Sequence, residues 1–124
     1  MEKILVIDDD PDVISLMRML LQKKHYDVAS ATKESEVDQL VVDFKPDIII
    51  MDVLLSGSDG RSICRNLKNA EASKHIPIIM FSGHPGAQKN IEEYGADEFI
   101  SKPFQSSALL DRIKHHLEKK KVSE

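Results

Sequence analysis

Residues 48–52 have the sequence Ile-Ile-Ile-Met-Asp, four apolar side chains in a row followed by an acid. A strand with one face in water alternates apolar and polar residues, whereas a strand buried on both faces is apolar throughout. The run therefore predicts an interior strand of a parallel sheet that is covered by helices on both faces. Other short apolar runs, two of them weaker, occupy residues 4–7, 27–31, 76–81 and 98–100.

Amphipathic stretches lie between these runs and predict helices. The first begins at Asp10-Pro11, because an acid can cap a first turn and proline suits its first position. A second opens near Thr32 and ends before Pro46. Three more are expected over residues 60–69, over about 87–94 (weaker), and from about 106 onward. Five strand-then-helix units predict a doubly wound α/β fold in one domain.

Composition narrows the class of protein. The 124 residues suit one domain, and 41% hydrophobic with 31% charged residues suit a packed core. The formal net charge of −4 argues against direct nucleic-acid binding, and the single cysteine excludes an intramolecular disulfide. No apolar run approaches the ~18 residues that span a bilayer, and the first residues lack a secretory signal pattern. We expect a cytoplasmic protein that does not bind membranes.

Polar side chains follow four of the predicted strands. The first strand is followed by acids at residues 8–10, the third by Asp52, the fourth by Ser82 and the fifth by Ser101-Lys102. The carboxyl ends of parallel strands share one edge of a sheet, and ligands bind there where the strand order reverses. With the order 2-1-3-4-5, that point lies between strands 1 and 3, so Asp8 and Asp9 should meet Asp52.

Three adjacent carboxylates repel one another and need compensating positive charge. Oxygen ligands with room for water suit Mg²⁺, so Asp8, Asp9 and Asp52 are the expected ligands. Lys102 would add a fixed cation and Ser82 a hydroxyl donor. This set predicts a site for a phosphoryl group, with Asp52, the central acid, as the nucleophile.

The chain resembles the receiver domain of bacterial two-component response regulators, of which the chemotaxis regulators are stand-alone examples. The resemblance runs from Lys3 to about Lys119. The matching motifs are Asp8-Asp9, Asp52 within Met-Asp-Val-Leu-Leu-Ser-Gly-Ser-Asp-Gly, Ser82, Gly95-Ala96-Asp97 and Lys102-Pro103. It implies a flavodoxin-like, five-stranded parallel sheet, with residues 1–120 as the receiver domain and 121–124 as a polar tail or the start of a linker. It also implies a phosphorelay signalling switch, not a turnover enzyme.

The resemblance further implies a role for each site residue. Asp52 would accept a phosphoryl group from a histidine kinase or phosphotransfer protein. Mg²⁺ would be held directly by Asp9 and Asp52, through water by Asp8, and by the backbone carbonyl of Leu54. Ser82 and Lys102 would then move to the phosphoryl oxygens and Phe99 would turn inward. The surface of helix 4, strand 5 and helix 5 would change for a downstream protein, an effector domain or a phosphorylation-dependent dimer.

Departures from the family pattern concern the loop after Asp52. Leu55-Ser56 stand where the family usually has Met-Pro, which predicts a more mobile loop over residues 56–58. Leu54 and His84 occupy the positions that tune phosphate lifetime in the family. Leu54 offers no polar group to orient an attacking water, so we expect a longer-lived acyl phosphate than with asparagine there.

Other readings of the same residues remain. Asp8 and Asp9 could only cap a helix, Lys102 could be a surface lysine, and Phe99 could only pack in the core. A phosphohydrolase of the haloacid dehalogenase type usually needs a second acid two residues after its nucleophile, where this chain has Leu54. A flavodoxin-like cofactor binder needs a glycine-rich or hydroxyl-rich loop after strand 1, where this chain has acids. A receiver-like scaffold that is never phosphorylated would not need the complete acid, hydroxyl and lysine set.

Overall fold

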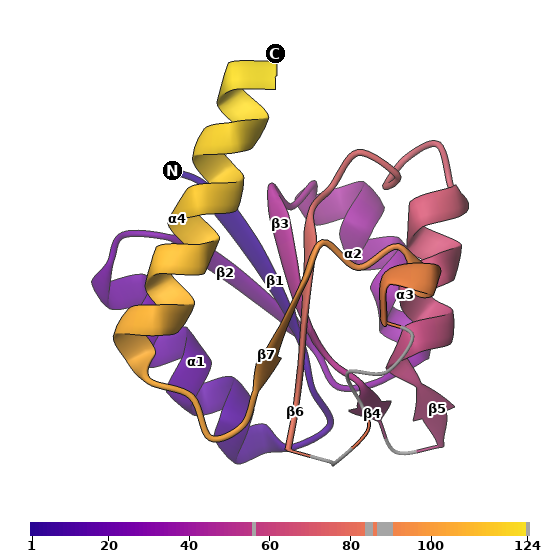
Figure 1. Cartoon of the computed structure of the whole chain (residues 1–124), viewed down its shortest axis with the longest axis horizontal. Helices are drawn as coiled ribbons and strands as arrows, with labels where there is room; N and C mark the ends of the chain where they lie inside the picture. Colours follow the sequence, from indigo (N-terminus) through magenta and orange to yellow (C-terminus); the bar gives the residue numbers. More distant parts are fainter. Residues whose placement is uncertain (56, 84–85, 87–90, 124) are drawn as a thin grey trace.

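A five-stranded parallel sheet forms the centre of the molecule, with helices on both faces (Figure 1). The computed structural model describes residues 1–55, 57–83, 86 and 91–123, without the side chains of 91–92 and 120–123. The sheet has the order β2-β1-β3-β6-β7, which confirms the predicted order 2-1-3-4-5. Its strands are β1 (Lys3–Ile7), β2 (Asp27–Ala31), β3 (Ile48–Asp52), β6 (Ile78–Ser82) and β7 (Glu98–Ser101).

The helices divide between the two faces. Buried side chains form two clusters. The α1/α4 cluster lies between the sheet and helices α1 and α4, and the α2/α3 cluster lies between the sheet and helices α2 and α3. The helices are α1 (Pro11–Lys23), α2 (Val37–Phe44), α3 (Gly60–Asn69) and α4 (Ser106–Ser123), with short 3-10 helices η1 (Glu34–Glu36) and η2 (Ile91–Tyr94). In the described parts of the chain, no helix is both long and apolar enough to span a membrane.

The run that predicted the fold lies at the middle of the sheet. All five residues of β3 are buried, with β1 on one side and β6 on the other. Their side chains alternate between the faces: Ile48 and Ile50 join the α1/α4 cluster, and Ile49 and Met51 join the α2/α3 cluster. Asp52 continues this alternation and so belongs to the α1/α4 face at the carboxyl end of the sheet.

Several element boundaries differ from the predicted ones. The fourth sheet strand begins at Ile78 instead of 76, after Pro77, which has no N–H to donate to a ladder. The helix expected from Thr32 begins as η1, because the Glu36 carboxylate accepts the backbone N–H groups of Thr32 and Lys33 and holds them outside the helix.

Two further differences concern the C-terminal half of the chain. Of the helix predicted over 87–94, residues 87–90 lie outside the described residues and 91–94 form η2. The helix α4 continues to Ser123, into the residues that were expected to form a polar tail or the start of a linker.

A short hairpin follows the third strand of the sheet. Strands β4 (Leu54–Leu55) and β5 (Ser58–Asp59) pair antiparallel, and Gly57 in the turn has a φ of 75°, which glycine adopts without strain. The Ser58 hydroxyl donates a hydrogen bond of 2.9 Å to Glu34 in η1. Greater mobility of the loop over 56–58 stays a prediction, and Ser56 lies outside the described residues.

Candidate functional site

Three carboxylates meet at the carboxyl edge of the sheet, where the strand order reverses between β1 and β3. Ile7 pairs with Met51, so the residues that follow them, Asp8 and Asp52, lie side by side. One oxygen atom from each of Asp8, Asp9 and Asp52 lies within 4.8 Å of the others. The structure thus brings together the three acids that the sequence placed at this edge.

Asp8 is the most deeply buried of the three, with 1% of its surface exposed. Its Oδ1 accepts the backbone N–H of Asp10 at 2.9 Å. Burial raises the pKa of Asp8 to about 6, an effect that the Asp10 hydrogen bond and Lys102 oppose and the other two acids reinforce. Water therefore compensates the charged form of Asp8 poorly, and a cation beside it would favour that form.

Asp52 is held at both of its oxygens. Oδ1 accepts the backbone N–H of Leu54 at 3.0 Å, and Oδ2 accepts a hydrogen bond from Lys102 Nζ at 3.1 Å. Its side chain keeps 12% of its surface exposed, which leaves an approach from solvent. A carboxylate fixed in this way and open on one side can act as a nucleophile.

The donor set fits a divalent cation. Among the described residues, Asp8 Oδ2 is buried and accepts no hydrogen bond, and Lys102 Nζ stands 3.5 Å from it. A buried carboxylate oxygen without a donor is costly, and a cation beside it would remove that cost. Three carboxylates with an open side match the oxygen ligands and retained waters of Mg²⁺.

Lys102 and Ser82 follow neighbouring strands at the same edge. Ser82 is buried and ends β6, where it pairs with Ser101 of β7. Lys102 lies one residue beyond β7, and its peptide bond to Pro103 is cis. Its amine forms ion pairs with both Asp52 and Asp8.

The remaining predicted site residues lie at the margins of this cluster. Leu54 presents its backbone to Asp52, and the residue is 41% exposed. Phe99 is half-buried in β7 and packs against the α2/α3 cluster. His84 lies outside the described residues.

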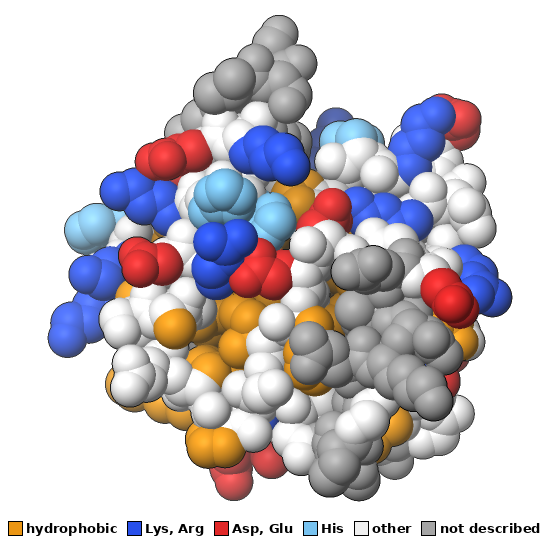
Figure 2. Space-filling view, viewed as in Figure 1, with side chains coloured by type: hydrophobic (Ala, Val, Ile, Leu, Met, Phe, Trp, Pro, Cys, Tyr) orange, Lys and Arg blue, Asp and Glu red, His pale blue; other side chains and the backbone are white. Residues whose placement is uncertain are grey.

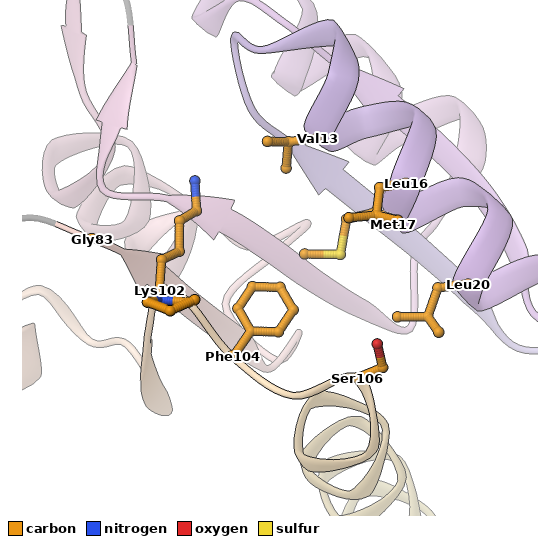
Figure 3. Close-up of a pocket in the computed structure, with 9 residues that line it drawn as sticks. Val13, Leu16, Met17, Leu20, Gly83, Lys102, Phe104 and Ser106 are labelled. Atoms are coloured by element: carbon orange, nitrogen blue, oxygen red, sulfur yellow. The ribbon is translucent and has the colours of Figure 1, made fainter.

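An apolar groove of about 500 Å³ adjoins the site on the α1 side. Val13, Leu16, Met17 and Leu20 of α1 face Phe104 across it, and the stem of Lys102 closes one end (Figure 3). Apolar side chains also lie along the β7–α4 connection at the surface, whereas charged and histidine side chains gather over the middle of α4 (Figure 2).

The fold and this arrangement of acids, lysine and hydroxyl define a signalling module of the receiver type, and comparison with known proteins agrees. The family model described as "Response regulator receiver domain" matches residues 4–114. The chain belongs to the response regulator receiver domain family.

Relatives of this chain include a transcriptional regulator. It is 34% identical over 116 residues to the DNA-binding dual master transcriptional regulator RpaA of Synechocystis, covering 92% of this chain and 48% of that protein. The chain thus spans about half the length of this curated relative.

Solved structures of receiver domains are also similar. The receiver domain of a signal transduction histidine kinase from Syntrophus aciditrophicus has a TM-score of 0.88 and 29% identity, covering 96% of this chain and 92% of that one. The BeF3-activated receiver domain of Klebsiella pneumoniae RstA has a TM-score of 0.84 and 28% identity, covering 94% and 98%.

Proposed function

We propose that this chain is a phosphoacceptor switch of a two-component phosphorelay, with Asp52 as the phosphorylated residue. One observation carries the proposal: the Asp52 carboxylate lies 3.1 Å from the amine of Lys102 and within a cluster that includes Asp8 and Asp9. The acids can hold a divalent cation, and the lysine can neutralise an incoming phosphoryl group.

The proposed reaction is transfer from a phosphohistidine of a histidine kinase or phosphotransfer protein. A carboxylate oxygen of Asp52 forms a bond to phosphorus while the bond from phosphorus to the imidazole nitrogen breaks, and the nitrogen leaves with the electron pair. The Leu54 N–H at Oδ1 fixes the plane of the carboxylate, and Lys102 stabilises negative charge on the transferred group.

Bound Mg²⁺ would neutralise charge on the phosphoryl oxygens during transfer. Asp9 and Asp52 would hold it directly, Asp8 mainly through water, and the Leu54 backbone carbonyl would complete the protein ligands. Asp8 Oδ2 supports this assignment, because it accepts no hydrogen bond among the described residues and lies 3.5 Å from Lys102 Nζ, and water bound to a cation would donate one to it.

Phosphorylation would change the surface that partners bind. New charge-assisted hydrogen bonds from Ser82 and Lys102 to the phosphoryl oxygens would favour a second state in which Phe99 turns inward. The surface formed by residues that precede β7, by β7 and by α4 would then bind a downstream protein, an effector domain or a second copy. On this proposal residues 1–120 form the receiver unit, and a cytoplasmic location stays a prediction.

The experiment is incubation with acetyl phosphate, with and without Mg²⁺, followed by intact-mass spectrometry. Wild type should gain one phosphoryl group only with Mg²⁺, and Asp52→Ala should gain none. Beryllium fluoride with Mg²⁺ should shift amide NMR signals in β7 and α4 of wild type alone. Absence of both responses would overturn the switch, and turnover of varied phosphate esters would favour the haloacid dehalogenase type of hydrolase.

A further inference from the structure

The strand order sets a geometric problem for Lys102. This residue follows β7, whereas its partner Asp52 ends β3, and β6 lies between the two strands. Two strand spacings amount to about 10 Å, so the lysine side chain has to cross the end of β6 to reach the carboxylate. The side chain at the end of β6 on that face should therefore lie directly beneath the amine.

Phe81 is the residue at that place. It pairs with Asp52 on one side and with Ile100 on the other, and neighbours in register share a face of the sheet. Its side chain belongs to the α1/α4 cluster and is 1% exposed. Lys102 Nζ lies 4.6 Å from the centre of the ring, within the range of a cation–π contact.

The ring of Phe81 is itself held in place. Phe104 packs against it edge to face, with ring centres 6.2 Å apart and planes at 79°. Phe104 also faces Met17 of α1 across the apolar groove, beside the stem of Lys102 (Figure 3). Aromatic pairs in this geometry fix ring orientation beyond what burial alone does.

We propose that Phe81 is a positioning residue for phosphoryl transfer at Asp52, and that it acts by holding the Lys102 ammonium on its ring face. The inference rests on the proposed function. Lysine has a long, flexible side chain that samples many rotamers, so a fixed aromatic surface limits where its charge can lie. The ring face attracts the cation, and the carboxylates of Asp52 and Asp8 bind the same amine.

The first test measures the contact between Lys102 and the Phe81 ring in the absence of metal and phosphate. In the metal-free protein, the ε-methylene protons of Lys102 should show an upfield ring-current shift in NMR, and Phe81→Leu should abolish it. Lys102 ε-protons at their ordinary shift in wild type would overturn the inference, whatever the protein does with a phosphodonor.

The second test separates ring electronics from packing. Site-specific incorporation of mono-, di- and trifluorophenylalanine at position 81 keeps the ring shape but weakens its negative face stepwise. The rate of Asp52 phosphorylation by acetyl phosphate should fall with each fluorine, to about threefold to tenfold below wild type for the trifluoro ring. If Phe81 only filled space, the phosphorylation rate would be the same for all three fluorinated rings.

Phe44 provides a matched control, because Lys3 Nζ lies 5.9 Å from its ring centre, away from the acid cluster. The same fluorinated series at position 44 should leave the rate unchanged. If wild type is phosphorylated normally and the rate does not change across the fluorinated variants at position 81, this inference is wrong and the proposed function still stands. A wild-type protein that takes no phosphoryl group would overturn the proposed function as well.

Discussion

The backbone carbonyl oxygen of Asp52 occupies the space that a β-carbon at Gly60 would need. The carbonyl of Val53 lies 2.9 Å from the same point, and it accepts the Gly60 N–H at 2.7 Å. The first residue of α3 is therefore packed directly against the end of β3. Since both obstructing atoms belong to the backbone, the clash cannot be relieved by a change of rotamer.

Gly60→Ala should consequently destabilise the fold by about 1–3 kcal/mol, the usual cost of overpacking. Urea unfolding followed by circular dichroism measures this. Gly83→Ala is the matched control, because a β-carbon there would meet Lys102 Cβ at an ordinary 3.5 Å. Equal stability of the two variants would contradict the argument.

Asp8→Asn should stabilise the metal-free protein at neutral pH. The pKa of Asp8 is raised by burial from 3.8 to about 6, so the folded state binds this proton more tightly than the unfolded state does. The contribution of Asp8 to the free energy of unfolding of wild type should therefore decrease as the pH rises from about 4 to about 7. The asparagine variant avoids that loss and should gain about 1–3 kcal/mol at neutral pH.

Urea unfolding in EDTA at about pH 7 and about pH 4 measures the gain, which should be smaller at the lower pH. Asp38→Asn, a change of an exposed acid on α2, is the control. Lower stability of Asp8→Asn at neutral pH would show that the charged carboxylate is satisfied in the metal-free fold.

Mg²⁺ should raise the melting temperature of wild type. A ligand that binds only the folded state adds about 2.7 kcal/mol at a hundredfold excess over its Kd. Asp52→Asn and Asp9→Asn should lose most of this shift, because each removes a proposed ligand. Calorimetry in MgCl2 and in NaCl of equal ionic strength separates site binding from screening; equal shifts in both salts would refute the metal site.

Leu54→Asn should shorten the lifetime of the acyl phosphate several-fold. Leu54 is 41% exposed beside Asp52, and an amide at this place could orient a water molecule for attack on phosphorus. The decay of phosphorylated protein after removal of the donor measures this. Leu54→Ala removes bulk without adding a polar group, so its acyl phosphate should decay more slowly than that of Leu54→Asn. Equal decay rates would mean that easier access of water to the phosphoryl group explains the whole effect.

Much of the fold and the acid cluster could be predicted because local rules apply to them. Buried strands are apolar throughout, and the carboxyl ends of parallel strands share an edge. Together with the strand order 2-1-3-4-5, those two rules bring Asp8 and Asp9 beside Asp52. Proline and capping signals likewise gave the start of α1, where the Asp10 side chain accepts the Asp12 N–H.

Contacts between side chains on different elements could not be predicted in the same way. Phe81 looks like any apolar strand residue in the sequence, because strand order alone does not show that the Lys102 side chain lies over its ring. Similarly, the His116 ring nitrogen lies 2.7 Å from Glu98, which also binds Arg112, although the sequence gives no sign of this pairing between β7 and α4. Such pairings depend on rotamers and on how a helix is rotated over the sheet.

The position of β7 in the sheet has a mechanical consequence. It is an edge strand, as β2 is, and among the described strands it pairs only with β6, so its displacement breaks one ladder of backbone hydrogen bonds, whereas displacement of β3 would break two. Lys102 connects Asp52 at the rigid centre to this edge. A chemical event at Asp52, on a strand paired on both sides, would thereby be transmitted to a strand paired on one side, whose displacement breaks fewer hydrogen bonds.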